Sequence, residues 1–154
     1  MFFKNSTQTR NSLLIAIAII TASCADCFQG VHINFPLEEE DKQIIQNIIS
    51  LFPRVLNNTI NCTDLRIYYD ITTFDRDMAN MGHYNILGLC TYHNGYSEVF
   101  IYRMTNDYLF IRVVIHEFLH TIGYKHGDEM ENVTETMMEH YYELYPKMED
   151  NEDD

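Results

Sequence analysis

The chain has 154 residues, of which 46% are hydrophobic, and it holds eleven tyrosines and nine phenylalanines. This length suits a single domain, and the apolar and aromatic content is enough for one core. The formal net charge of −13 argues against nucleic acid and anionic membrane surfaces as partners, because both repel an acidic protein.

The first 25 residues have the order of a secretory signal peptide. Lys4 and Arg10 precede an apolar run at 13–20, and small residues follow up to Ala25. We expect cleavage after Ala25, with cleavage after Cys24 as the second choice, and hence a secreted, extracellular protein. A membrane anchor is the alternative, but the run is much shorter than the ~20 apolar residues that span a bilayer. No stable membrane insertion is therefore expected.

Removal of the signal peptide leaves 8 basic and 23 acidic residues, a net charge of −15. Part of this charge lies at 149–154, a like-charge tail for which we expect a solvated, disordered end. Residues 26–148 then form the predicted folded domain. N-x-Thr sequons, which predict glycan acceptors in a eukaryotic secretory route, begin at Asn57, Asn61 and Asn132.

Three cysteines remain after cleavage, namely Cys27, Cys62 and Cys90. In an oxidising compartment this odd number predicts one disulfide and one free or intermolecular thiol. Cys62 and Cys90 both lie inside the folded region, whereas Cys27 stands in the first residues of the mature chain. We therefore expect a disulfide between Cys62 and Cys90.

The first half of the mature chain alternates between strand and helix patterns. Apolar and polar residues alternate at 31–36, which predicts a strand. The segment 37–58 has acidic residues in its first turn and apolar pairs at helical spacing, so it predicts an amphipathic helix. Pro53 is expected to kink or end that helix. Further strands are predicted at 65–71, 86–93 and 98–103, the last two joined by a turn at 93–96.

The second half is predicted to be mainly helical. A long apolar run from Thr105 predicts a buried helix with Thr105 or Asn106 as its N-cap. Residues 131–146 predict a shorter helix or a turn leading into one. The order of elements is typical of an α+β domain, here with a small twisted mixed sheet packed on the helix that follows Thr105.

That helix carries the stretch HEFLHTIGYKH at 116–126. Residues four apart lie on one helix face, so His116 and His120 can direct both imidazoles at one point. His126 would lie roughly 9 Å farther along a straight helix, too far for Zn–N bonds of ~2 Å. Gly123 solves this problem, because glycine accepts the left-handed conformation that ends a helix. The spacing therefore predicts a zinc site at His116, His120 and His126.

Three protein ligands leave a fourth position for water, which distinguishes a catalytic zinc site from a structural one. Glu117 stands next to the first ligand. A carboxylate there can accept a proton from the water as it attacks a carbonyl group and can later pass the proton to the leaving amine. We therefore expect Glu117 to be the general base of a hydrolase.

At these residues the chain resembles the metzincin clan of zinc metallopeptidases, whose signature is this long motif followed by a Met-containing turn. Its general organisation is similar to that of matrixins and astacins. The resemblance implies a Zn²⁺-dependent endopeptidase domain at 26–148, monomeric and acting on a peptide or protein substrate. It also implies a Met-turn at Met138, or alternatively Met137, as the floor of the site. The strand implied to form the substrate rim comprises Leu87, Gly88, Leu89, Cys90, Thr91 and Tyr92.

Some positions differ from the metzincin pattern. Tyr141 comes three residues after Met138, not two as in astacins, so its part at the metal is open. A gluzincin arrangement would take its third ligand from Glu139 or Glu143, but it leaves Gly123 unexplained. Latency by a large propeptide is not expected, and Cys27 could cap the zinc as a thiolate. The alternative function is an inactive, secreted zinc-binding interaction protein of the same fold, against which the intact Glu117 argues.

Overall fold

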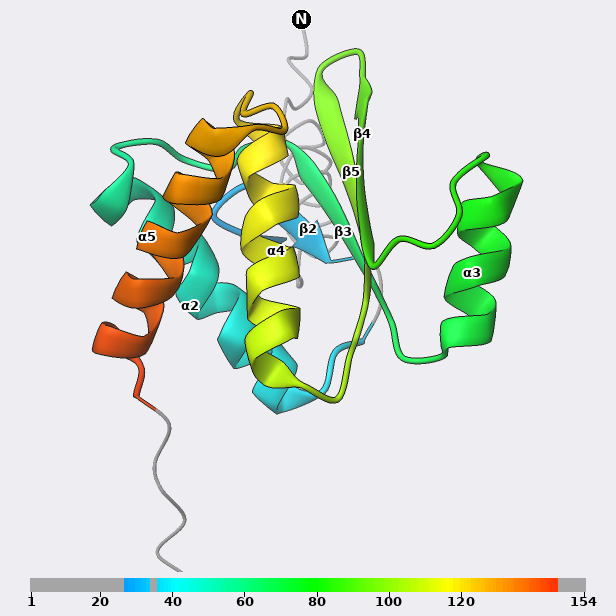
Figure 1. Ribbon diagram of the computed structural model, residues 1–154, viewed down its shortest axis with the longest axis horizontal. Coiled ribbons are helices and arrows are strands. Elements are labelled where there is room, and N and C mark those ends of the chain that lie inside the picture. The colour runs from blue at the N-terminus through cyan, green and yellow to red at the C-terminus, as the bar shows by residue number, and fades with distance from the viewer. Residues whose placement is uncertain (1–26, 34–35, 147–154) are drawn as a thin grey trace, which may run out of the picture.

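The computed structural model describes residues 27–33 and 36–146 (Figure 1). The predicted signal peptide at 1–25 and the acidic tail at 149–154 lie outside these residues, as do the positions of the proposed cleavage. The described chain forms a mixed sheet with helices on both of its faces. This arrangement confirms the predicted α+β class and the mixed sheet packed on a helix.

The sheet has the strand order β1-β2-β3-β5-β4. Strands β2, β3 and β5 run parallel to one another, whereas β1 and β4 pair antiparallel with their neighbours at the two edges. Strand β4 is therefore an edge strand joined to β5 by a tight hairpin turn. The strands are β1 (Cys27–Phe28), β2 (Val31–Ile33), β3 (Thr63–Tyr68), β4 (Gly88–His93) and β5 (Tyr96–Tyr102).

Three helices pack on one face of the sheet and one packs on the other (Figure 1). Successive side chains of a strand point to opposite faces, so Leu65 and Val99 enter the large core under the three helices, while Phe100 faces the single helix. The three helices are α2 (Glu39–Val55), α4 (Asp107–Thr121) and α5 (Asp128–Leu144), and the single helix is α3 (Ile71–Asn80).

Helix α2 forms as the apolar pairs predict, with Ile45 and Ile48 fully buried. The prediction that Pro53 ends the helix is wrong, because the helix continues to Val55. A proline removes one helical hydrogen bond, but Pro53 stands in the last turn, directly after the fully buried Phe52. Packing of that turn against the core offsets the missing bond.

Helix α3 was not predicted. Its N-cap is Asp70, whose carboxylate accepts a hydrogen bond from the Thr73 amide at 2.8 Å. Phe74 and Met78 lie one turn apart, and both are buried against Phe100 in a small second core. A sequence signal was therefore present, namely an Asp cap followed by apolar residues at four-residue spacing.

Helix α4 runs through the centre of the molecule, between α5 and the β4–β5 hairpin (Figure 1). Asn106 is its N-cap, because the Asn106 side chain accepts a hydrogen bond from the Leu109 amide at 2.9 Å. Helix α5 starts at Asp128, before the predicted 131–146, and it packs on both α4 and α2. The segment is therefore a helix, and the alternative prediction of a turn leading into a helix is wrong.

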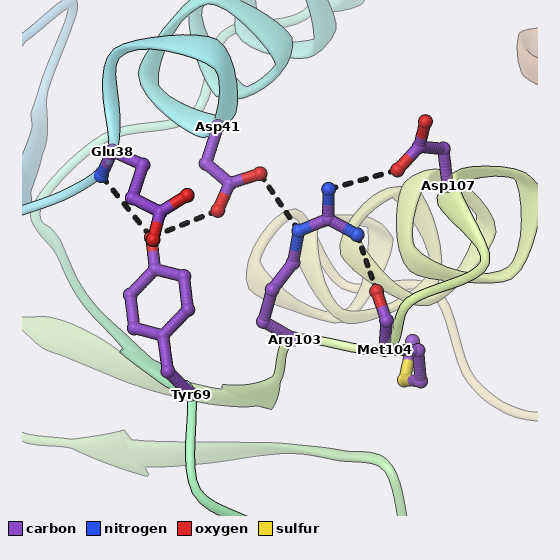
Figure 2. Close-up of polar contacts among 6 residues, drawn as sticks. All are labelled: Glu38, Asp41, Tyr69, Arg103, Met104 and Asp107. Atoms are coloured by element: carbon purple, nitrogen blue, oxygen red, sulfur yellow. Dashed lines mark hydrogen bonds and ion pairs between the residues drawn. The ribbon is translucent and has the colours of Figure 1, made fainter.

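A partly buried ion-pair network joins the N-terminal ends of α2 and α4 to the end of β5 (Figure 2). Arg103 Nε lies 2.7 Å from Asp41 Oδ1, and Arg103 Nη2 lies 2.8 Å from Asp107 Oδ1. The Tyr69 hydroxyl donates to the other oxygen of Asp41 at 2.8 Å. The guanidinium also lies 4.4 Å from the ring centroid of Phe110. These contacts fix the start of the motif-bearing helix relative to the sheet.

In the part of the chain that the structure describes, no helix is both long enough and apolar enough to cross a membrane.

Candidate metal centre

The three predicted histidines come together at the C-terminal end of α4. His116 and His120 lie on one face of the helix, and His126 comes from the loop before α5. One nitrogen of each ring lies within 4.8 Å of one nitrogen of each of the other two. Among the described residues, this is the one group of three or more potential ligands that could hold a metal ion.

The loop returns His126 to the helix because a glycine follows the C-cap of α4. Gly123 has φ +101°, in the left-handed region. The Gly123 amide donates to the His120 carbonyl at 2.9 Å, and the Tyr124 amide donates to the Leu119 carbonyl at 3.1 Å. This pair of bonds is the Schellman motif. The turn predicted at Gly123 is therefore confirmed.

The electrostatics of His116 and His120 suit metal ligands. Burial, reinforced by His120 and His126, lowers the pKa of His116 to about 4. Burial also lowers the pKa of His120. His120 Nδ1 lies 2.9 Å from the Tyr124 carbonyl oxygen; because a carbonyl only accepts, this nitrogen carries the proton and Nε2 stays available. Neutral imidazoles with one fixed tautomer are the form that binds zinc.

Glu117 is buried beside the histidines, with only 7% of its surface exposed. Desolvation raises the pKa of its carboxyl to about 7. The side chain lines a pocket of about 410 Å³ together with His116 and His126. A carboxylate that shares a pocket with two of the three potential ligands is in position to exchange protons with a molecule held there.

A second pocket of about 540 Å³ is lined by His126 and His120. Strand β4 runs past both pockets, because Gly88 lines the first and Tyr92 lines the second. Both pockets are therefore lined by residues of β4 and of the histidine cluster.

The predicted rim, Leu87 to Tyr92, corresponds to β4 with Leu87 just before it. Gly88, Cys90 and Tyr92 face α4, and the Tyr92 hydroxyl donates to the His120 carbonyl. Leu89 faces the opposite side and packs with the small core around Phe74. Among the described residues, no strand pairs with the outer edge of β4.

The predicted Met-turn is wrong. Met137 and Met138 both lie inside α5, a continuous helix from Asp128 to Leu144. Both side chains are buried in the large core. Tyr141, one turn farther on, is also buried there. Burial raises the pKa of the Tyr141 hydroxyl, and a hydrogen bond with Asn47 of α2 partly offsets this rise. The apolar spacing of a helix face overrides the turn that the family pattern implies.

The predicted disulfide between Cys62 and Cys90 is also wrong, because both cysteines are free. Strand β5 separates the two: Cys90 pairs with Val99, while Thr63, which follows Cys62, pairs with Ser97. Two interstrand steps of about 4.8 Å each already exceed the ~7 Å limit between bridged Cα atoms. Nothing in the sequence reveals the strand order that keeps them apart.

The remaining predicted residues lie on the surface. The sequon residues Asn57, Asn61 and Asn132 are exposed. Glu139 and Glu143, the alternative ligands, are exposed on α5 and do not belong to the ligand cluster.

Sequence reasoning missed two contacts of the site. Arg112, one turn before His116, forms ion pairs with Glu131 and Glu135 and so ties α4 to α5. Gly88 brings the backbone of β4 directly against Glu117. The first contact was detectable as a basic residue on the motif face of the helix. The second depends on strand placement and had no local signal.

No protein-family model matches the sequence, and no curated protein matches it. The resemblance to metzincins therefore rests on the sequence motif.

Proposed function

We propose that the protein is a secreted, zinc-dependent endopeptidase of the metzincin type. The observation that carries the proposal is the convergence of His116, His120 and His126 beside the buried Glu117. Structural zinc sites are commonly closed by four protein ligands, whereas three histidines leave room for water and substrate. A site that only binds metal through three histidines does not require a buried carboxylate beside them, so Glu117 favours a catalytic site.

When bound, zinc would lower the pKa of a water molecule to about 7 and polarise the carbonyl group to be attacked. Glu117 would accept the proton of that water at its carboxylate and donate it to the departing amine. His120 would be held for binding by its hydrogen bond to Tyr124. Tyr92 would hold β4 against the end of α4 through the His120 carbonyl.

The proposed substrate is an extended peptide or a flexible segment of a protein. Strand β4 offers an outer edge to which such a chain can add as a further strand, with main-chain hydrogen bonds giving affinity. The pockets of about 410 and 540 Å³ that His126 lines can take side chains of the substrate. A strand edge can accept the middle of a chain as well as its end, so an endopeptidase is favoured over an enzyme that removes terminal residues.

The decisive experiment compares the purified protein with its Glu117→Gln variant. Glutamine keeps the size and leaves the histidines in place, so equimolar zinc should be retained. Cleavage of a mixed peptide library should fall by about 10²–10⁴-fold, because an amide cannot act as the base. A chelator should abolish the wild-type activity. Glu40→Gln, the same change at an exposed position on α2, should have no effect.

Two results would contradict the proposal. Cleavage by Glu117→Gln at the wild-type rate would exclude Glu117 as the base. A wild-type protein that binds equimolar zinc but cleaves no peptide would favour the zinc-binding interaction protein instead.

A further inference from the structure

Gly88 lies so close to Glu117 that no side chain fits between them. A Cβ atom at Gly88 would stand 2.7 Å from Glu117 Cγ, 2.8 Å from Glu117 Oε1 and 2.9 Å from Val113 Cγ1. Carbon atoms in contact prefer separations of about 3.5–4.0 Å. Any substituted residue at this position must therefore displace α4 side chains or move β4.

The Glu117 side chain cannot make room for a Cβ atom by moving its carboxylate alone. It is 7% exposed, and the displaced atoms include Cγ, which is tied to the helix by a single further carbon. Val113, one turn before Glu117, occupies the neighbouring space. A clash with Cγ is relieved by a change of rotamer, and a new rotamer carries the carboxylate to another place.

Strand β4 has little freedom to move away. On one side its residues pair with β5, with Gly88 opposite Ile101. Just before the strand, the Leu87 carbonyl accepts a hydrogen bond from the Tyr102 amide at 3.0 Å. The far end is held by the Tyr92 contact with the His120 carbonyl. Leu89 packs into the small core behind the strand.

We propose that Gly88 is a positioning residue that sets the place of the Glu117 carboxylate. The absent side chain lets the strand backbone form one wall of the carboxylate's pocket. This wall holds Glu117 in the pocket that His116 and His126 also line. The inference rests on the proposed function for its catalytic consequence, but the contact between Gly88 and Glu117 can be tested without any enzyme activity.

The catalytic test is the Gly88→Ala variant, with zinc content, kcat and KM measured separately. Zinc should stay equimolar, because no ligand changes. The kcat should fall about ten- to a hundredfold, the loss expected when a catalytic group is misplaced by about 1 Å, while KM changes little. A mere defect of the substrate rim would instead raise KM and leave kcat unchanged. Gly82→Ala, at a glycine of φ +85° where the added Cβ would meet no side chain or other segment within 4 Å, should cost stability without a loss of kcat.

The structural test is a double-mutant cycle read as thermal unfolding of the protein. Gly88→Ala is measured in the wild-type background and in the Glu117→Ala background, where Cγ and both carboxylate oxygens are gone. The drop in Tm should be clearly smaller in the second background, since residues in contact are energetically coupled.

An unchanged kcat in Gly88→Ala, or a cycle in which the two changes simply add, would overturn the inference. If the wild-type protein cleaves no peptide, the proposed function fails, and the cycle still decides whether Gly88 positions Glu117.

Discussion

His120 turns its Nδ1 atom toward the carbonyl oxygen of Tyr124, 2.9 Å away and four residues farther along the chain. The acceptor is a main-chain group beyond the end of the helix, so its position depends on how α4 terminates. Gly123 is the residue that decides this, because its positive φ reverses the chain between His120 and Tyr124. Gly123 therefore fixes the tautomer of His120 and also brings His126 back toward the helix.

We predict that Gly123→Ala weakens zinc binding as well as stability. A left-handed conformation costs a non-glycine residue about 1–2 kcal/mol, and a shift of the loop disturbs both Tyr124 and His126. The zinc affinity should fall by about tenfold or more, the usual effect of losing a partner that orients a ligand. Competition with a chromophoric chelator measures the affinity, and urea unfolding measures the stability.

The matched control is Gly82→Ala, because α3 ends in the same motif. The Gly82 amide donates to the Ala79 carbonyl and the His83 amide donates to the Met78 carbonyl. The control should lose similar stability and keep its zinc affinity. Equal losses of affinity in both variants would show that Gly123 acts through overall stability alone.

We predict that His126→Ala loses most of its bound zinc. Two histidines on one helix turn make an incomplete set, since zinc sites of this kind use three protein ligands. Metal analysis of the purified variant gives the content directly, and His83→Ala, at an exposed histidine outside the cluster, should stay equimolar. Retention of zinc in His126→Ala together with its loss in Glu139→Ala would move the protein to the gluzincin arrangement.

We predict that Cys62 and Cys90 are alkylated at very different rates. Cys62 is exposed, whereas burial raises the pKa of the Cys90 thiol to about 11. The thiolate is the reactive form, so at pH 8 and without reductant Cys90 should react more than about tenfold more slowly. Peptide mapping after timed iodoacetamide treatment follows each cysteine. Protection of both residues that disappears on reduction would restore the disulfide.

We predict that Arg103→Met destabilises the protein by about 3 kcal/mol, the usual cost of removing one partner of a buried ion pair. The side chains of Arg103 and Asp41 are only 15% and 3% exposed, so Asp41 would be left with a buried, uncompensated charge. The free energy of unfolding in urea gives the loss. Arg76→Met removes an exposed pair with Asp77, 66% and 37% exposed, and should change stability little. A small effect of both variants would mean that the network in Figure 2 adds no stability.

Local sequence was enough for much of the helix that carries the site. The spacing of His116 and His120 places both rings on one face, Asn106 begins the helix and Gly123 ends it. Each of these features depends on residues within one or two turns, where backbone geometry is fixed by residue type. The same holds for the paired isoleucines of α2, and Asp70 with Phe74 and Met78 carried a readable signal for α3.

The tertiary structure decided the features that join distant segments. The strand order places β5 between Cys62 and Cys90 and brings Gly88 onto Glu117. The packing of α5 on α4 and α2 makes Met137 and Met138 core residues of a helix, where the family pattern implies a turn. These outcomes follow from which hydrophobic faces bury one another, a choice that depends on the whole chain and that no short window of residues contains.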